Sequence, residues 1–129
     1  MRERVVVVAA VIEQEGRFLV ARRLEGTHLA GYWEFPGGKV HAHETHEQAL
    51  GRELLEELGT TADGFQKLFA ASHDYPERTV ELHFYRARLA GSPVPAIGQE
   101  LRWISRGEFA ELEFPPADAE LIARLASGE

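Results

Sequence analysis

Cysteine is absent from the 129-residue sequence, which excludes disulfide bonds and metal sites built on thiolates. This absence is typical of cytoplasmic proteins, and the cytoplasm is the location that we expect. Positive charge is scarce as well, because 14 lysines and arginines stand against 21 aspartates and glutamates, for a net charge of −7. Long nucleic acids need many basic side chains to neutralise their phosphates, so we expect none as a partner. A short polyphosphate needs only a few local cations, and a bound metal can supply them.

Long hydrophobic runs are also missing. The longest, residues 5–12, falls short of the roughly 18 residues that a transmembrane helix needs. The basic residues before this run would suit a signal peptide, but Glu3 lies among them and Glu13 ends the run. The run therefore predicts a buried strand. Since no linker, repeat or low-complexity tract is visible, the length predicts one domain, residues 1–129, with no membrane association.

Turn residues and hydrophobic periodicity divide the chain into alternating strands and helices. Strands are expected at residues 5–13, 18–23, 33–35, 65–75, 79–89 and 101–104, with loops at residues 24–31 and 91–98. The clearest helix spans residues 46–58, because Thr45 and Gln48 form the pattern of a capping box and Gly59 suits the helix end. A last helix is expected after Pro115-Pro116, up to about residue 126. Interleaved strands and helices predict an α/β or α+β fold with a mixed sheet.

Three glutamates are neighbours on the first predicted helix. Glu53, Glu56 and Glu57 occupy positions i, i+3 and i+4, beside an apolar stripe of leucines. Like charges at these spacings repel each other, and a cation between them is the best explanation of the pattern. A ligand set of oxygens alone favours Mg²⁺ or Mn²⁺ over Zn²⁺. Such an ion can hold phosphate oxygens and lower the pKa of a bound water, while a spare carboxylate accepts the proton.

The residues around this trio also suit a site. Arg52 precedes Glu56 by one turn, within reach of an ion pair, and Glu44 could fold over Arg52 and brace the loop. Gly37-Gly38 lets the backbone approach a ligand closely, at the point where we expect a turn to end the strand of residues 33–35. Taken singly, paired glutamates usually form a solvated face and two glycines a turn. Their combination carries the functional interpretation.

The segment from Gly38 to Thr60 resembles the signature box of the Nudix family. The positions that match are Gly38, Glu44, Arg52-Glu53-Leu54, Glu56-Glu57 and Gly59, and only the final aliphatic position differs, where Thr60 stands. Residues 27–29, 33–39, 75–78 and 114–118 are similar to the MutT branch of that family. The resemblance covers nearly the whole chain, which has about the minimal size of that branch.

The resemblance implies an α/β/α sandwich around a mixed sheet, and a hydrolase that depends on Mg²⁺ or Mn²⁺. Members of the branch cleave nucleoside triphosphates to the monophosphate and pyrophosphate, with water attacking the β-phosphorus. The implied metal ligands are Glu53, Glu56, Glu57 and a backbone carbonyl of Gly37 or Gly38. Glu53 is the expected general base, with Arg52 and Glu44 as orienting residues. The implied substrate contacts are Arg23, His28, Phe35, Arg78 and Asp118.

Simpler interpretations compete for several of these residues. Arg23, His28 and Arg78 would also suit ordinary strand-end, loop and hairpin-tip positions, and Phe35 is expected to be at least partly in the core. Asp118 would also suit the first turn of a helix, where the helix dipole favours an acid.

The resemblance first implies an oxidised nucleotide such as 8-oxo-dGTP as the substrate, and its hydrolysis removes the damaged nucleotide from the nucleotide pool. We expect the enzyme to be a monomer or a weak homodimer. The best-known 8-oxoguanine enzymes of this type carry an asparagine where Asp118 stands. An asparagine donates and accepts hydrogen bonds, whereas an ionised aspartate only accepts, which suits the amino group of cytosine. CTP or a modified dCTP therefore stays open as the substrate. Other Nudix substrates, such as dinucleoside polyphosphates, and a non-catalytic nucleotide-binding module are further alternatives.

Two more features bear on the site. Ile97 stands where the branch often carries an acidic loop residue, and Glu100 is a candidate replacement. His41, His43 and His46 lie close together before and at the start of the predicted helix. We interpret them as residues of a solvated loop that tune the pH dependence, in preference to a zinc site.

Overall fold

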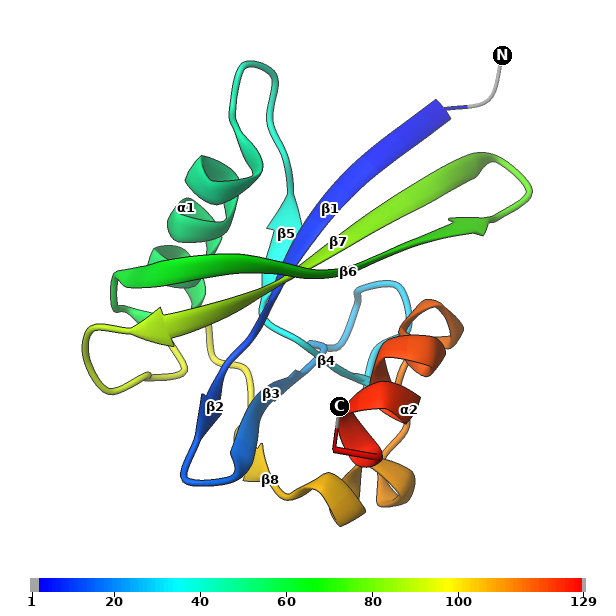
Figure 1. Ribbon diagram of the computed structural model, residues 1–129. Coiled ribbons are helices and arrows are strands. Elements are labelled where there is room, and N and C mark those ends of the chain that lie inside the picture. Colours follow the sequence, from blue (N-terminus) through cyan, green and yellow to red (C-terminus); the bar gives the residue numbers. More distant parts are fainter. Residues whose placement is uncertain (1–2, 129) are drawn as a thin grey trace.

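The computed structural model describes residues 3–128, and their strands form two four-stranded sheets (Figure 1). The first sheet has the order β5–β1–β7–β6. Its strands are β1 (Glu3–Val11), β5 (Gly37–Lys39), β6 (Ala62–Asp74) and β7 (Arg78–Leu89). The sheet is mixed, because β1 runs parallel to β7 and antiparallel to β5, while β6 and β7 form the predicted antiparallel hairpin.

The second sheet is antiparallel and smaller. Its strands are β2 (Glu13–Gln14), β3 (Arg17–Arg22), β4 (Trp33–Glu34) and β8 (Leu101–Ile104). β3 lies in its centre and pairs with all three of the others. Trp33, the first residue of β4, pairs with Arg22 of β3. Glu34 and Phe35 follow it, and the chain then continues through Pro36 into β5 of the first sheet.

The helix α1 (His46–Leu58) has the predicted bounds, and local sequence explains both ends. The backbone N–H of Gln48 donates to the Thr45 hydroxyl, and the Gln48 side chain accepts from the Thr45 N–H, which confirms the capping box. Gly59 ends the helix with φ 69°, in the left-handed region that glycine adopts without strain. The other helices are α2 (Ala119–Ala126) and two 3₁₀ helices at Arg106–Glu111 and Pro116–Asp118.

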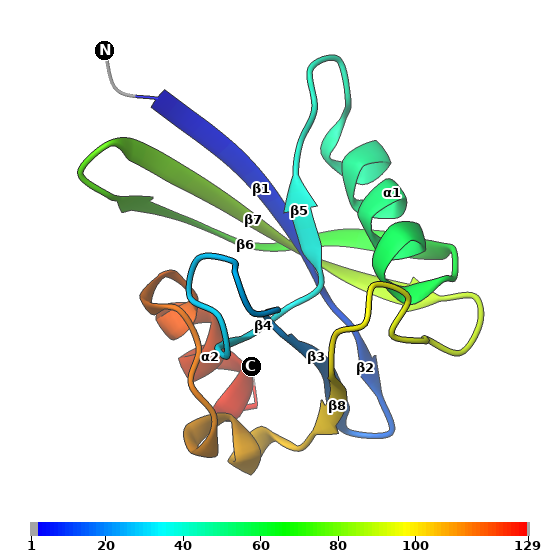
Figure 2. The same ribbon diagram turned by 180° about the vertical axis from the view of Figure 1, so that it is seen from behind.

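Alternation along β1 builds two hydrophobic clusters. Val8 and Ala10 pack with the buried residues of α1, whereas Ala9 and Val11 pack with a phenylalanine-rich cluster that includes Leu121 of α2. Successive side chains of a strand point to opposite faces, so β1 is covered on both sides. Figure 2 shows α1 and α2 on opposite sides of the strands. The expected α/β/α sandwich is confirmed, although its strands divide into two sheets.

Two elements differ from the expectation. Gly37 and Gly38 were predicted as part of a turn, but they lie in the strand β5 (Gly37–Lys39), which pairs with β1. A Cβ on Gly37 would lie 2.0 Å from the carbonyl oxygen of Val8, so only glycine allows this close pairing. The 3₁₀ helix of residues 106–111 was not predicted either, although Ser105 and Glu108 form a capping box at its start. None of the helices within residues 3–128 is long and apolar enough to cross a membrane.

Candidate active site

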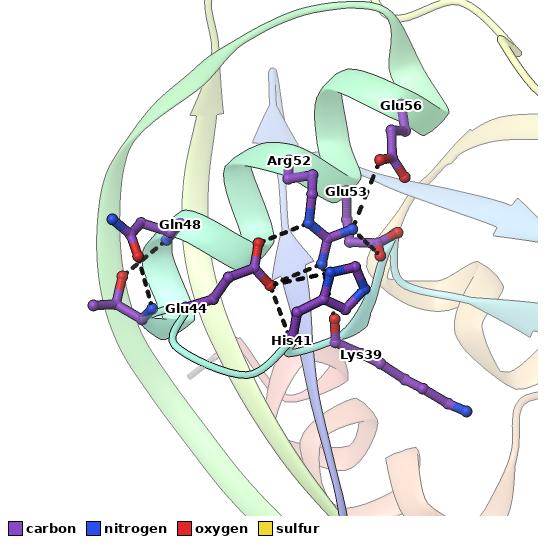
Figure 3. Close-up of polar contacts among 8 residues, drawn as sticks. Lys39, His41, Glu44, Gln48, Arg52, Glu53 and Glu56 are labelled. Carbon is purple, nitrogen blue, oxygen red and sulfur yellow. Dashed lines mark hydrogen bonds and ion pairs between the residues drawn. The ribbon is translucent and has the colours of Figure 1, made fainter.

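Arg52 stands at the centre of a hydrogen-bond network beside α1 (Figure 3). Its Nε and Nη2 donate to the two carboxylate oxygens of Glu44 at 2.7 and 3.0 Å. Its Nη1 donates to Glu53 at 2.8 Å, and Nη2 also reaches the carbonyl oxygen of Lys39 at 3.0 Å. The hydrogen bonds from Arg52 lower the pKa of Glu44 to about 2. The predicted contact between Glu44 and Arg52 is confirmed, and it joins the loop, β5 and α1 around Glu53.

Glu53 lies against the backbone of β5. A Cβ on Gly38 would come within 2.4 Å of the Glu53 carboxyl carbon and 2.6 Å of both its oxygens. The space that holds this carboxylate therefore exists because residue 38 has no side chain. Gly38 and Glu53, both implied as metal ligands, therefore lie next to each other.

Glu57 shares a hydrogen bond with Glu53 one turn earlier. Burial and the neighbouring Glu53 raise the pKa of Glu57 well above its ordinary value, with Glu34 adding to the shift. Two carboxylates held in contact at a partly desolvated place cannot both be charged without a large energetic cost. Burial beside Glu53 therefore favours a proton on Glu57 or a cation next to it.

Glu56 is not joined to that pair. Its carboxylate lies 3.7 Å from Nη1 of Arg52, and its side chain is 57% exposed (Figure 3). Across residues 3–128, no three acidic or histidine side chains are grouped tightly enough to enclose a metal ion together. The structure thus brings two members of the predicted trio together and leaves the third beside Arg52, next to solvent.

Arg23 and Glu34 form a second charged group at the end of β3 and in β4. Arg23 donates from Nη1 to Glu34 at 2.6 Å and from Nε to the carbonyl oxygen of His28 at 2.5 Å. Burial raises the pKa of Glu34, Arg23 opposes that shift, and Glu53 adds to it. Glu34 therefore lies in the electrostatic range of the carboxylates of α1. Glu34 was not predicted as a site residue, and its place two residues before Pro36-Gly37-Gly38 was the available signal.

The remaining predicted substrate residues have different environments. Asp118 is only 6% exposed, and burial, with Glu34 nearby, raises its pKa to about 7. Phe35 is buried in an aromatic cluster with Phe84, which agrees with its expected place in the core. Arg78 is the first residue of β7, and its Nε lies 3.7 Å from Oε1 of Glu3. Asp118 thus shares a charged environment with the Arg23–Glu34 group, while Arg78 lies near a strand end.

The histidines before α1 do not act as one cluster. His46 forms a hydrogen bond with the Tyr85 hydroxyl at 2.8 Å, and its ring lies 4.4 Å from that of His83. Burial lowers the pKa of His46, and His83 and Lys67 act in the same direction. His41 and His43 stay in the exposed loop. The interpretation as solvated loop residues is therefore wrong for His46, which packs against the sheet.

The loop between β7 and β8 carries the other departure from the family pattern. Ile97 is half exposed, and Oε1 of Glu100 lies 3.6 Å from Nη1 of Arg22. A hollow of about 360 Å³ occurs near the turn between β2 and β3, lined by Val11, Glu13, Glu15, Gly16, Arg86 and Ala87. It shares no residue with the carboxylates of α1. We therefore identify the candidate site by its charges and hydrogen bonds.

The arrangement described so far agrees with a known domain. A model of the NUDIX domain matches residues 7–124, which is most of the chain and includes every element around Arg52 and Glu53. This protein belongs to the Nudix hydrolase family. The resemblance expected from the box of residues 38–60 is confirmed.

Relatives of this Nudix hydrolase carry more than one activity in their names. A protein of Haemophilus influenzae named 8-oxo-dGTP diphosphatase is 41% identical over 121 residues, which cover 92% of this chain and 89% of the relative. A CTP pyrophosphohydrolase of Escherichia coli is 38% identical over 117 residues, 90% of this chain and 87% of that one. The solved structure of a MutT protein from methicillin-resistant Staphylococcus aureus 252 matches with a TM-score of 0.81 at 32% identity, and 100% of each chain is covered. These matches confirm the predicted resemblance of the chain to the MutT-like branch.

Nudix hydrolases generally use divalent metals, and the residues of α1 and β5 fit such an ion. Glu53 and Glu57 provide carboxylate oxygens that are already in contact, and Gly38 leaves room for one of them. These are the hard oxygen donors that Mg²⁺ and Mn²⁺ prefer. A divalent cation would take the place of the proton that burial favours on Glu57.

Proposed function

We propose that this Nudix hydrolase converts a nucleoside triphosphate to the monophosphate and pyrophosphate, with 8-oxo-dGTP as the first candidate substrate. The observation that carries this proposal is the contact between Glu53 and Glu57, with Arg52 bound to Glu53 on its other side. The names of the relatives support the choice of substrate. Hydrolysis of such a nucleotide would keep an oxidised base out of DNA synthesis.

Glu53, Glu57 and Glu56 would hold Mg²⁺ or Mn²⁺, together with a backbone carbonyl of Gly37 or Gly38. Glu56 would join the set by turning from Arg52 toward the other two carboxylates. When bound, the metal neutralises phosphate charge and lowers the pKa of a coordinated water. The remaining roles belong to side chains of this chain.

Glu53 would accept the proton of the water that attacks the β-phosphorus. Arg52 cannot take this proton, because a guanidinium keeps its charge in proteins, but it holds one oxygen of Glu53 in place. Glu44 in turn binds Arg52 through two oxygens, a geometry that fixes the guanidinium plane. Arg52 and Glu44 are therefore positioning residues for the base.

The Arg23–Glu34 group would meet the substrate. Arg23 supplies a positive charge for a phosphate, and its bonds to Glu34 and the His28 carbonyl oxygen set its direction. Asp118 would contact the base, with Phe35 shaping the site from the core. Arg78 would add a second basic contact from the β6–β7 hairpin. We expect the enzyme in the cytoplasm, as a monomer or weak homodimer.

The proposal is tested by measuring pyrophosphate release from 8-oxo-dGTP, dGTP, CTP and 5-methyl-dCTP in the presence of Mg²⁺. Glu53→Gln should lower kcat by orders of magnitude, on the scale of about 10²–10⁴ for a general base, while the thermal unfolding curve stays unchanged. Glu47→Gln is the matched control, because Glu47 is an exposed glutamate of the same helix. No turnover of any of the four nucleotides would refute the proposal. Near-normal turnover by Glu53→Gln would refute the assignment of the base.

A second substrate class, CTP or a modified dCTP, is favoured by Asp118. Its buried carboxyl has a pKa near 7, so the ionised and the protonated form both occur at neutral pH. The ionised form accepts from the amino group of cytosine, whereas the protonated form can donate as well as accept, as an asparagine does. The ratio of kcat/KM for 8-oxo-dGTP to that for CTP separates the two classes. Asp118→Asn should raise this ratio, and an unchanged ratio would exclude Asp118 from recognition of the base.

A further inference from the structure

The segment between β7 and β8 crosses the C-terminal end of α1. Figure 2 shows this segment, in yellow before β8, passing the end of the helix. Within it, the side chain of Gln99 is almost completely buried, with 5% of the residue exposed. A buried amide is stable only when its donors and its acceptor find partners, so its hydrogen bonds show what the side chain does.

The amide of Gln99 joins the loop to the helix. Its Nε2 donates to the backbone carbonyl oxygen of Glu57 at 2.7 Å, and its Oε1 accepts from the N–H of Ile97 at 3.1 Å. The N–H of Ala96 donates to the same Glu57 oxygen at 3.1 Å, and the N–H of Val94 donates to the Leu58 oxygen at 2.9 Å. The last carbonyls of a helix lack partners within the helix. Here the loop provides them, and Gln99 is the side chain that does so at Glu57.

The last turn of α1 needs such support. The helix has no basic residue in that turn, so no side chain there offsets the negative end of the helix dipole. Glu57 lies one turn after Glu53 on the same face of α1, so the backbone of Glu57 sets where its carboxylate lies relative to that of Glu53. Gln99 is hydrogen-bonded to that backbone.

We propose that Gln99 is a positioning residue of the metal site, which holds the backbone of Glu57 so that its carboxylate stays beside that of Glu53. This inference rests on the proposed function in one respect, namely that Glu57 is a metal ligand. Ile97 offers no carboxylate at this position of the loop, and Gln99 provides a side-chain hydrogen bond from the loop to the backbone of Glu57.

Binding of Mn²⁺ alone to the full-length protein tests the inference without substrate or turnover. Gln99→Leu has a similar size but lacks both hydrogen bonds, and we expect it to raise the Kd for Mn²⁺ about tenfold, the lower end of what lost support around a metal ligand costs. In turnover, the Mg²⁺ concentration at half-maximal rate should rise as well, with little change in the KM of the nucleotide at saturating Mg²⁺. If Gln99→Leu does not fold, Gln99→Asn takes its place, because its amide is one methylene too short for both bonds.

Thr60→Val is the matched control. Thr60 is a buried polar residue that holds the other end of the same loop, because its Oγ1 accepts from the Gly91 N–H at 2.8 Å. This variant should lower the melting temperature about as much as Gln99→Leu and leave the Kd for Mn²⁺ unchanged. Equal weakening of Mn²⁺ binding by both variants would overturn the inference, because the effect would then come from the loop as a whole.

Glu57→Gln separates the inference from the proposed function. If this variant binds Mn²⁺ as tightly as the parent, Glu57 is not a ligand, and the ligand assignment and the inference both fail. If Glu57→Gln weakens binding but Gln99→Leu does not, the ligand assignment stands and the role of Gln99 is refuted. Weakening by both, with Thr60→Val unaffected, is the expected result.

Discussion

The strongest test of the candidate site adds one methyl group beside Glu53. In Gly38→Ala, the new Cβ would lie 2.4 Å from the Glu53 carboxyl carbon, whereas ordinary contacts begin at 3.4 Å. The carboxylate must therefore move by about 1.0 Å. It can do so because it is the end of a flexible side chain, and Gly38 is not among the glycines with positive φ. We expect the protein to fold.

The size of the effect follows from that displacement. A reacting group misplaced by about 1 Å costs about 100-fold in rate, so kcat should fall by about this factor, which corresponds to about 2.7 kcal/mol. Stability should stay the same or rise by up to about 1 kcal/mol, because alanine restricts the unfolded chain more than glycine does. Pyrophosphate release at saturating Mg²⁺ and thermal unfolding measure the two quantities.

Gly51→Ala is the control for the added methyl group. Gly51 lies in α1, and a Cβ there would meet no atom within 4 Å. The substitution should stabilise the helix by roughly 0.5–1 kcal/mol and leave kcat unchanged. A folded Gly38→Ala variant with the kcat of the parent would refute the view that the missing side chain at residue 38 makes room for the catalytic carboxylate.

Three other results are expected. Gly37→Ala places a Cβ 2.0 Å from the backbone oxygen of Val8, which belongs to a paired strand and cannot move away. Thermal unfolding should therefore show a large loss of stability. A normal melting temperature would contradict the close pairing of β5 with β1. Arg52→Lys keeps the positive charge but loses the planar guanidinium that binds Glu44 with two donors. The kcat should fall while the circular dichroism spectrum stays unchanged. A kcat equal to that of the parent would show that the charge alone suffices. Because the pKa of His46 is lowered from 6.5 in the folded state, its contribution to stability is complete above pH 6.5 and is lost as the pH falls through the lowered value. Melting temperatures measured against pH should be flatter below pH 6.5 in His46→Gln, and identical profiles would exclude this residue from the pH response.

Local signals explain why α1 was predicted so closely. The capping residue Thr45, the leucines at helical spacing and Gly59 all lie within the helix or directly beside it. The contact of Arg52 with Glu44 was predictable for a similar reason, because helical periodicity fixes the direction of Arg52 and the loop is short. The fold class followed from the alternation of strands and helices.

Long-range packing explains what was missed. The strand β5 depends on its pairing with β1, about thirty residues earlier, and glycines show no local preference for strands. Nothing in the spacing of the box connects Glu34 or Gln99 with the carboxylates of α1, because only the folded sheets and the loop bring them near. The i, i+4 spacing allows Glu56 both a place in the glutamate trio and the ion pair with Arg52, and only the folded structure shows that it takes the ion pair.

The parallel pairing of β1 with β7 has a consequence for synthesis of the chain. The ends of these strands, Val11 and Leu89, are 78 residues apart in sequence, although Val11 and Arg86 are partners in the sheet. At about 5–20 residues per second, the ribosome needs roughly 4–16 s to deliver β7 after β1 has been made. During that time β1 lacks the strand that pairs along its whole length, and an unpaired strand edge is a site at which another chain can pair. Any fragment that stops before residue 78 lacks β7, so the edge of β1 that β7 covers has no partner within the fragment.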